Sequence, residues 1–239
     1  MAWIEGPVVG FDTETTGVDV GQDRIVTAAV VRRDGDETSV TSWLIDPGVE
    51  IPEGAAAIHG ITTEHARRFG HAPAGALEEI ATTLSRALMR GEPVVAYNAS
   101  FDLSLLDAEL RRYGLATVPE RIEREVRVVV DPLVLDRSLD RFRRGKRKLG
   151  DLCAFYGVQS TADLHTADVD VLATLDVLAA IARRYPEVAE TTLDTLHDRQ
   201  IQAHRDWAEG FNAWRSRQGL TGPGAELTWP VRLQEPALV

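Results

Sequence analysis

The sequence contains a single cysteine, Cys153, so no disulfide bond can form within one chain. A chain without disulfides fits a reducing compartment, and we expect a cytoplasmic protein. The first residues lack the basic start and the apolar run of a secretory signal peptide. No run of about 18 apolar residues occurs either, so the sequence predicts no membrane span and no membrane partner.

Positive charge is scarce as well. The 26 Lys and Arg residues face 37 Asp and Glu residues, and the formal net charge is −11. Proteins that coat nucleic acid broadly are basic overall, so this composition argues against such a role. It leaves room for a local basic groove, or for a catalytic centre whose carboxylates are neutralised by metal.

A P-loop and a Gly-x-Gly-x-x-Gly fingerprint are also missing, which removes support for a nucleotide switch or a dehydrogenase.

The hydrophobic content of 44% is enough for a sizeable core, and 239 residues fit one large domain or a domain with an extension. Alternation and turn residues predict strands at 8–12, 23–33, 38–45, 93–98 and 126–131. Helical spacing predicts helices at 74–89, 100–113, 132–139, 149–156 and 167–184, with one or two more between 186 and 218. A further short helix is expected after Thr62 or Thr63, either of which can cap it. This order predicts an antiparallel meander followed by alternating strands and helices, an α/β protein with a mixed sheet flanked by helices.

Two carboxylates follow the first predicted strand. Asp12 and Glu14 are two positions apart, so on a strand they point to the same face. Neighbouring carboxylates repel each other unless a cation neutralises them, and hard oxygen ligands suit Mg²⁺ or Mn²⁺. When so short a motif is considered alone, a solvated strand edge is the better explanation.

Two later stretches carry further candidate residues. Asn98 and Asp102 lie where a predicted strand gives way to a helix, and His165 and Asp170 lie at the start of a later helix. Each has an ordinary structural explanation, because Asn favours turns and Asp favours the first turn of a helix. A single histidine in such a loop is most often a surface or capping residue.

Taken together, Asp-x-Glu, Asn-x-x-x-Asp and His-x-x-x-x-Asp, in this order and at these separations, resemble the DEDDh 3′–5′ exonucleases. This group includes the proofreading ε subunit of bacterial DNA polymerase III and ribonuclease T. The segment Ile58–Thr62 also resembles one that is common in ε-like members. The resemblance covers about residues 5–185 and implies a ribonuclease-H-like fold with a mixed five-stranded sheet. We therefore expect an exonuclease domain at 1–185, with a helical extension and tail at 186–239.

The resemblance also implies a role for each acidic residue. Asp12 would bridge two Mg²⁺ or Mn²⁺ ions, Glu14 and Asp170 would complete the site of the ion that holds the attacking water, and Asp102 would hold the second ion largely through water. Two metals clamp both ends of an in-line phosphoryl displacement. Asp168 competes with Asp170, but on a helix the two are about 200° apart, and the family spacing selects Asp170.

His165 would be the general base, since an imidazole ordinarily titrates near neutrality and can take a proton from water. A tyrosine at this position would mark the sister DEDDy group. Substrate contacts are expected at Thr13, Thr15, Thr16, His59, Asn98 and Phe101. For Phe101, core packing is an equally good explanation.

Other charged and aromatic residues receive simpler interpretations. Asp131 and Asp136 are expected to be structural. The basic run at Arg137, Arg141, Arg143, Arg144, Lys146, Arg147 and Lys148 is expected to bind phosphates upstream of the cut, with a solvated face as the alternative. The stripe of Trp207, Phe211 and Trp214 is expected to pack the extension onto the catalytic domain, or else to dock a polymerase or a second copy.

The sequence thus predicts a metal-dependent 3′–5′ exonuclease that releases nucleoside 5′-monophosphates from single-stranded DNA or frayed 3′ ends. One alternative keeps this chemistry and trims RNA 3′ ends. Another is a polymerase-associated proofreading or scaffold module. The presence of all four carboxylates and His165 argues against a non-catalytic role.

Overall fold

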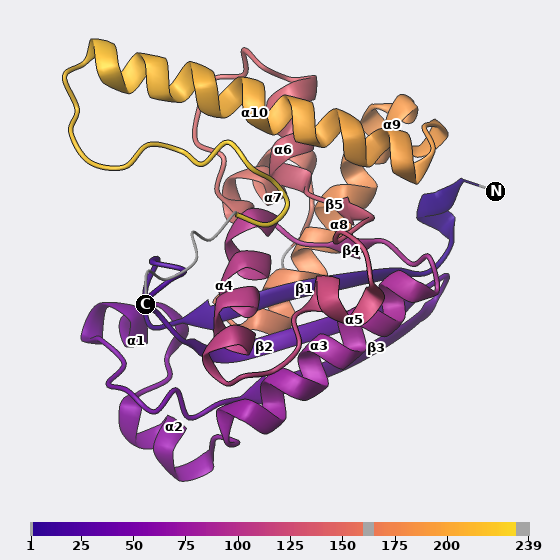
Figure 1. Cartoon of the computed structure of the whole chain (residues 1–239). Coiled ribbons are helices and arrows are strands. Elements are labelled where there is room, and N and C mark those ends of the chain that lie inside the picture. Colours follow the sequence, from indigo (N-terminus) through magenta and orange to yellow (C-terminus); the bar gives the residue numbers. More distant parts are fainter. Residues whose placement is uncertain (1, 160–164, 233–239) are drawn as a thin grey trace.

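A computed structural model describes residues 2–159 and 165–232, which form an α/β fold around a five-stranded sheet in the order β3-β2-β1-β4-β5 (Figure 1). β1 (Val8–Thr15), β2 (Ile25–Asp34) and β3 (Glu37–Leu44) form an antiparallel meander. β4 (Val94–Val95) and β5 (Val129–Val130) run parallel to β1. The predicted mixed five-stranded sheet is therefore confirmed, with its last two strands shorter than expected.

The longer helices lie where the apolar spacing predicts them. They are α3 (Pro73–Met89), α4 (Ala99–Arg112), α6 (Pro132–Leu139), α7 (Leu149–Tyr156), α8 (Ala167–Arg184) and α10 (Leu193–Arg217). The short elements are η1 (Trp3–Glu5), α1 (Glu53–His59), α2 (Thr63–Phe69), α5 (Val118–Ile122) and α9 (Pro186–Glu190). In α2 the predicted cap is Thr62, whose hydroxyl accepts the His65 N–H at 3.2 Å. No helix within residues 2–159 and 165–232 is long and apolar enough to cross a membrane.

Helices pack on both faces of the sheet (Figure 1). On one face, α3 and α4 bury Leu77 and Leu106 in the cluster that contains Phe11 of β1. On the other face, α8 lies across β1 and β2. Its close approach depends on Gly10, because a Cβ at that position would lie 2.3 Å from Cγ1 of Val171. A side chain at position 10 would push the first turns of α8 away from β1.

The edge strand β5 is completed by side chains of α10. The Val129 N–H donates to Nδ1 of His197 at 3.1 Å, and burial lowers the pKa of His197, which favours the neutral form that accepts. Gln200 donates to the Val129 carbonyl at 3.1 Å and accepts the Asp131 N–H at 2.7 Å. Three backbone groups that a sixth strand would otherwise pair are thereby satisfied.

The chain after α10 returns to the body of the protein. Asn212 exchanges two hydrogen bonds with the backbone of Ala225, at 2.8 and 2.7 Å. Trp229 is buried, with its ring 5.0 Å from that of His197. Residues 233–239 of the expected tail lie outside the described residues, and the expected domain boundary at residue 185 stays a prediction.

The aromatic stripe on α10 contacts the domain only in part. The rings of Trp207, Phe211 and Trp214 stack in sequence, with centroids 5.5 and 5.8 Å apart. The Arg137 guanidinium lies 3.7 Å from the centre of the Trp207 ring, so this end packs on α6. Trp214 is 46% exposed, so the prediction that the stripe packs onto the domain is wrong at that residue.

Replacing Gln200 by leucine tests the contribution of α10 to β5. Leucine fills a similar volume but leaves the Asp131 N–H and the Val129 carbonyl without these partners. An unsatisfied buried group costs about 1–3 kcal/mol, so the free energy of unfolding should fall by at least that amount in urea denaturation. The control is Gln202→Leu on the same helix, where the exposed side chain donates only to Asp206. That variant should stay within about 0.5 kcal/mol of wild type. Equal stability of the two variants would contradict this account of the edge.

Candidate active site

Three carboxylates meet at the end of the sheet where the parallel strands β1, β4 and β5 have their C-terminal ends. Asp12 and Glu14 lie on β1 and Asp170 lies in the first turn of α8. Each offers one oxygen, and these oxygens lie within 4.8 Å of one another. Asp168, the competitor of Asp170, is not a member of this group among the described residues. The position of α8, set by its contact at Gly10, brings the third carboxylate to the other two.

Asp102 supplies a fourth carboxylate from the first turn of α4. Its Oδ1 accepts the backbone N–H of Thr13 at 3.1 Å and the Thr13 hydroxyl at 2.6 Å. The residue is buried, and its charge acts on Asp12. Asn98 turns the chain from β4 into α4 with a left-handed backbone, φ 59°. Asparagine is one of the few residues that accept this conformation readily.

Asp131 holds the turn at Asn98 in place. It therefore has the structural role predicted for it. Its carboxylate accepts the N–H groups of Asn98, Ala99 and Leu133, at 3.1, 2.9 and 2.9 Å. It therefore caps α6 and holds the start of α4 at once. Because Gln200 accepts the N–H of Asp131, α10 contacts the residue that orients the Asp102 helix.

Burial, together with the charges of neighbouring carboxylates, makes the four carboxylates difficult to ionise. Burial, followed by the charges of Asp102, Asp170 and Glu14, holds the pKa of Asp12 well above its ordinary value. Burial and Asp170 raise the pKa of Glu14 to about 7. Burial also raises the pKa of Asp102 to about 7, against the opposing effect of its hydrogen bonds from Thr13. Such a set of hard oxygen donors fits divalent cations, which would relieve the repulsion.

His165 lies beside this group, at the loop that enters α8. Its backbone N–H donates to Oδ1 of Asp170 at 3.3 Å, and both this bond and the charge of the imidazole lower the pKa of Asp170 against the effect of burial. The residue is exposed, and its φ of 115° is unusual for a residue with a side chain. The preceding residues 160–164 lie outside the described part of the chain.

The three threonines predicted to contact substrate lie around the carboxylates. Their hydroxyls already form hydrogen bonds within the protein. Thr13 donates to Asp102, as described above. The Thr15 hydroxyl donates to the Gly17 carbonyl at 2.6 Å, and the Thr16 hydroxyl donates to Asp23 at 2.7 Å. Thr15 and Thr16 thus shape the loop after β1, and Thr13 joins β1 to α4. Contacts from them to a substrate stay a prediction.

His59 and Phe101 are also partly or fully covered. His59 is buried at the end of α1, where Nδ1 accepts the Ile61 N–H at 3.2 Å. Burial lowers its pKa, an effect that the Thr15 carbonyl opposes, so His59 lies close to the end of β1. Phe101 is partly buried and packs against the core cluster of α3 and α4. Core packing is therefore observed for Phe101, and its contact with a base stays a prediction.

The basic run does not act as one surface. Asp136 is fully buried and accepts from Arg143 at 2.8 Å, from Arg147 and from the Tyr156 hydroxyl at 2.8 Å. This confirms the structural role expected of Asp136. It also corrects the expectation for the run, since Arg143 and Arg147 are engaged inward, as is Arg137 on the Trp207 ring.

Comparison with known proteins identifies the family to which this geometry belongs. Residues 9–178, well over half of the chain, match the family model described as RNase T exonuclease. The chain belongs to this exonuclease family. The match contains all five predicted catalytic positions, from Asp12 to Asp170, and confirms the family resemblance.

The regions that match this exonuclease domain are parts of larger proteins. The PolC-type DNA polymerase III of Lacticaseibacillus paracasei is 30% identical over 80% of this chain, and the match is 12% of that protein. An epsilon-like DNA polymerase III subunit protein of Rhodobacter capsulatus is 39% identical over 41% of this chain and 14% of its own length. The chain therefore spans a small part of the relatives that it matches.

Solved structures show the same fold. Escherichia coli exonuclease I in complex with a dT13 oligonucleotide superposes with a TM-score of 0.66, at 21% identity over 77% of this chain and 43% of that one. Exonuclease I from Methylocaldum szegediense gives 0.63, at 25% identity over 88% of this chain and 45% of that one. These matches confirm the ribonuclease-H-like exonuclease fold.

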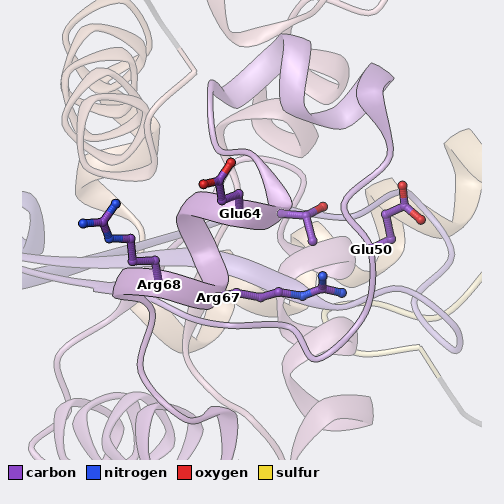
Figure 2. Close-up of a pocket in the computed structure, with 5 residues that line it drawn as sticks. Glu50, Glu64, Arg67 and Arg68 are labelled. Carbon is purple, nitrogen blue, oxygen red and sulfur yellow. The ribbon is translucent and has the colours of Figure 1, made fainter.

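A separate hollow of about 680 Å³ lies beside α2 of the exonuclease domain. It is lined by Glu50, Thr63, Glu64, Arg67 and Arg68, and Figure 2 shows Glu50 and Arg67 extending into it from two segments. Its wall carries charges of both signs and none of the four carboxylates. The candidate catalytic centre of the exonuclease domain is therefore the cluster at the end of β1.

The burial of Glu14 and its repulsion by Asp170 predict how stability changes with pH when metal is removed. The pKa of Glu14 is raised from 4.5 to about 7, so the folded protein binds more protons than the unfolded chain between these values. Stability then falls as pH rises through this window. Glu14→Gln removes this penalty, so in chelator at pH 7.5 it should melt higher than wild type. We expect a gain on the order of 1 kcal/mol, or about 2–4 °C for a chain of this size.

The comparison between wild type and Glu14→Gln separates Glu14 from the buried histidines, which both proteins share. The difference in melting temperature should shrink as pH is lowered to 5. Added Mg²⁺ should raise the melting temperature of wild type more at pH 7.5 than at pH 5. A difference that is constant with pH, or one of opposite sign, would contradict the raised pKa.

Proposed function

We propose that this chain is a metal-dependent 3′–5′ exonuclease that hydrolyses unpaired DNA ends and releases nucleoside 5′-monophosphates. The observation that carries the proposal is the meeting of Asp12, Glu14 and Asp170 within 4.8 Å, with Asp102 adjoining and His165 at the rim. Membership of an exonuclease family supports the same chemistry.

The carboxylates would hold two Mg²⁺ or Mn²⁺ ions. Asp12 has both Asp102 and the pair of Glu14 and Asp170 as electrostatic neighbours, which suits a residue shared by two ions. When bound, such ions polarise the phosphate and lower the pKa of a coordinated water. Asp102, already committed to Thr13 through Oδ1, would act largely through water.

His165 would take the proton of the attacking water. Its backbone N–H is bonded to Asp170, so the residue is anchored to one carboxylate of the site. Its exposure allows a ring nitrogen to accept a proton at the site and release it to solvent. This role requires the imidazole to be within hydrogen-bond reach of the water, which an exposed side chain at the rim can provide.

DNA is the favoured substrate because of the relatives. They carry the names of DNA polymerases, and the E. coli exonuclease I structure contains a dT13 oligonucleotide. The alternatives are an enzyme that trims RNA 3′ ends and a proofreading module that works within a polymerase assembly. Association with a polymerase or with a second copy stays a prediction, as does a cytoplasmic location. Degradation of matched 3′-labelled single-stranded DNA and RNA, with and without Mg²⁺, decides between the substrates.

Substitution of the two aspartates at the start of α8 tests the metal site. Asp170→Asn should abolish measurable hydrolysis while leaving the fold intact, because it removes one charge from a repelling group. Asp168→Asn is the matched control in the same helical turn and should keep activity close to wild type. Activity should also disappear in excess chelator and return with Mg²⁺ or Mn²⁺. Undiminished hydrolysis in chelator would exclude this mechanism.

His165→Ala tests the general base. General-base catalysis supplies about 10²–10⁴-fold, so the single-turnover rate should fall by about that factor. Binding of substrate should change little, because the proposed role is confined to the chemical step. The apparent affinity for a 3′-labelled strand would be measured beside the rate. A near-normal single-turnover rate would assign His165 a structural role only.

A further inference from the structure

The side chains of the basic loop between α6 and α7, residues 140–148, fall into two sets. Arg143 and Arg147 both bind the buried carboxylate of Asp136. The Arg143 guanidinium also lies 4.4 Å from the centre of the Phe155 ring. These inward contacts fix the loop against α6 and α7.

Several residues around these two anchors are exposed to solvent. Phe142 is 88% exposed, and Arg144, Lys146 and Lys148 are exposed as well. The Arg141 guanidinium lies 5.9 Å from the centre of the Phe142 ring. Lys146 and Lys148 are the only lysines in the sequence. The fixed loop therefore presents an aromatic ring beside several exposed cations, on a chain whose net charge is −11.

A hydrogen bond places this loop at the same end of the sheet as the carboxylates. The Tyr97 hydroxyl donates to the Arg147 carbonyl at 2.5 Å. Tyr97 directly precedes Asn98, where the chain turns into the helix that carries Asp102. The end of the loop at Lys148 is thereby close to the active site, and Phe142 lies farther along it.

We propose that the loop is a clamp for the unpaired strand that leads into the active site. Phe142 stacks on a base, and Arg144, Lys146 and Lys148 bind the phosphates on either side. An exposed aromatic ring beside cations recognises single strands, because free bases offer a face for stacking and the backbone carries regular negative charge. A duplex hides its base faces and would gain only the charge contacts. The clamp rests on the proposed function, because that function supplies the strand.

The stacking step is tested by equilibrium binding of a fluorescent single-stranded oligonucleotide. His165→Ala protein with Mg²⁺ serves as the background, because it should cut the strand about 10²–10⁴-fold more slowly. Added to it, Phe142→Ala should weaken binding about 5- to 100-fold, since stacking contributes about 1–3 kcal/mol per base. The ring is exposed, so the melting temperature should not change. On a strand of the same length without bases, the variant should bind as its background does. Equal affinity of Phe142→Ala and its background for the normal strand would overturn the stacking role.

The charge step is tested by the salt dependence of binding. Arg144→Gln, Lys146→Gln and Lys148→Gln combined should lower the slope of log affinity against log salt by about 2, at about 0.7 for each phosphate contact. In the active enzyme the same change should raise KM and leave kcat near wild type. The control replaces the exposed Arg86, Arg183 and Arg217 by glutamine, with the same change in net charge. If both triple variants keep the wild-type slope, or lose it equally, the loop does not bind the strand.

The two lysines allow an independent measurement. Acylation of Lys146 and Lys148 by a lysine-reactive ester can be followed by peptide mass spectrometry, apart from the terminal amine. A bound single strand should slow this reaction, and a blunt duplex at equal phosphate concentration should protect less. Equal reaction rates with and without the single strand would overturn the clamp.

These experiments separate the clamp from the proposed function. Binding and protection do not depend on hydrolysis, so the loop can govern affinity even if no strand is cut, in which case the exonuclease proposal alone fails. If strands are cut normally and the loop variants bind like their controls, the clamp alone fails.

Discussion

The structure is built around carboxylates that are held together although their charges repel. Asp12 and Glu14 lie on β1, a central strand of the sheet, and Asp170 is brought to them by a helix packed directly on Gly10. No flexible loop carries these three carboxylates, so they have little freedom to separate. Burial raises the pKa of all three, and the charge of Asp170 adds to the rise at Asp12 and Glu14. A site that is preorganised in this way has met the cost of assembly during folding and need not meet it again when a cation binds.

The fourth carboxylate depends on a longer chain of contacts. Asp102 is bonded to Thr13, and its helix begins at amides held by Asp131. The backbone of Asp131 is in turn bonded to Gln200, in a helix beyond the region that matches the exonuclease family. The two sides of the site therefore have different supports. One rests on the sheet and α8, and the other rests on a helix outside the matched residues 9–178.

The sequence predicts α6, α7 and α8 well because local signals coincide there. Proline begins α6, glycine ends α7, and the apolar spacing of α8 is long and regular. The candidate site is predicted by motif order, which places Asp12, Glu14 and Asp170 together without knowledge of any contact. The short helix α1 escapes because it contains too few residues to show a period. For α5 a signal existed in the capping box of Thr117 and Glu120.

Residue roles that depend on a distant partner could not be read from the sequence. Arg143 and Arg144 are adjacent and alike, yet one is bound to a buried carboxylate and the other faces water. The difference is set by Asp136, whose burial is a result of how three helices pack. The same holds for Trp214. It belongs to the same periodic stripe as Trp207, but Arg137 covers the Trp207 ring while Trp214 is exposed.

The side chains of α10 on β5 also affect how copies of this protein meet in a crowded solution. An unpaired edge strand is a template on which another chain can add, which leads to aggregation. At β5 the backbone groups of Val129 are taken by His197 and Gln200, so this edge cannot recruit a foreign strand. The opposite edge, β3, is open but carries exposed Glu, Thr and Ser side chains along most of its length. One edge is thus closed by hydrogen bonds and the other carries polar side chains, so neither edge favours the addition of a strand from a neighbour.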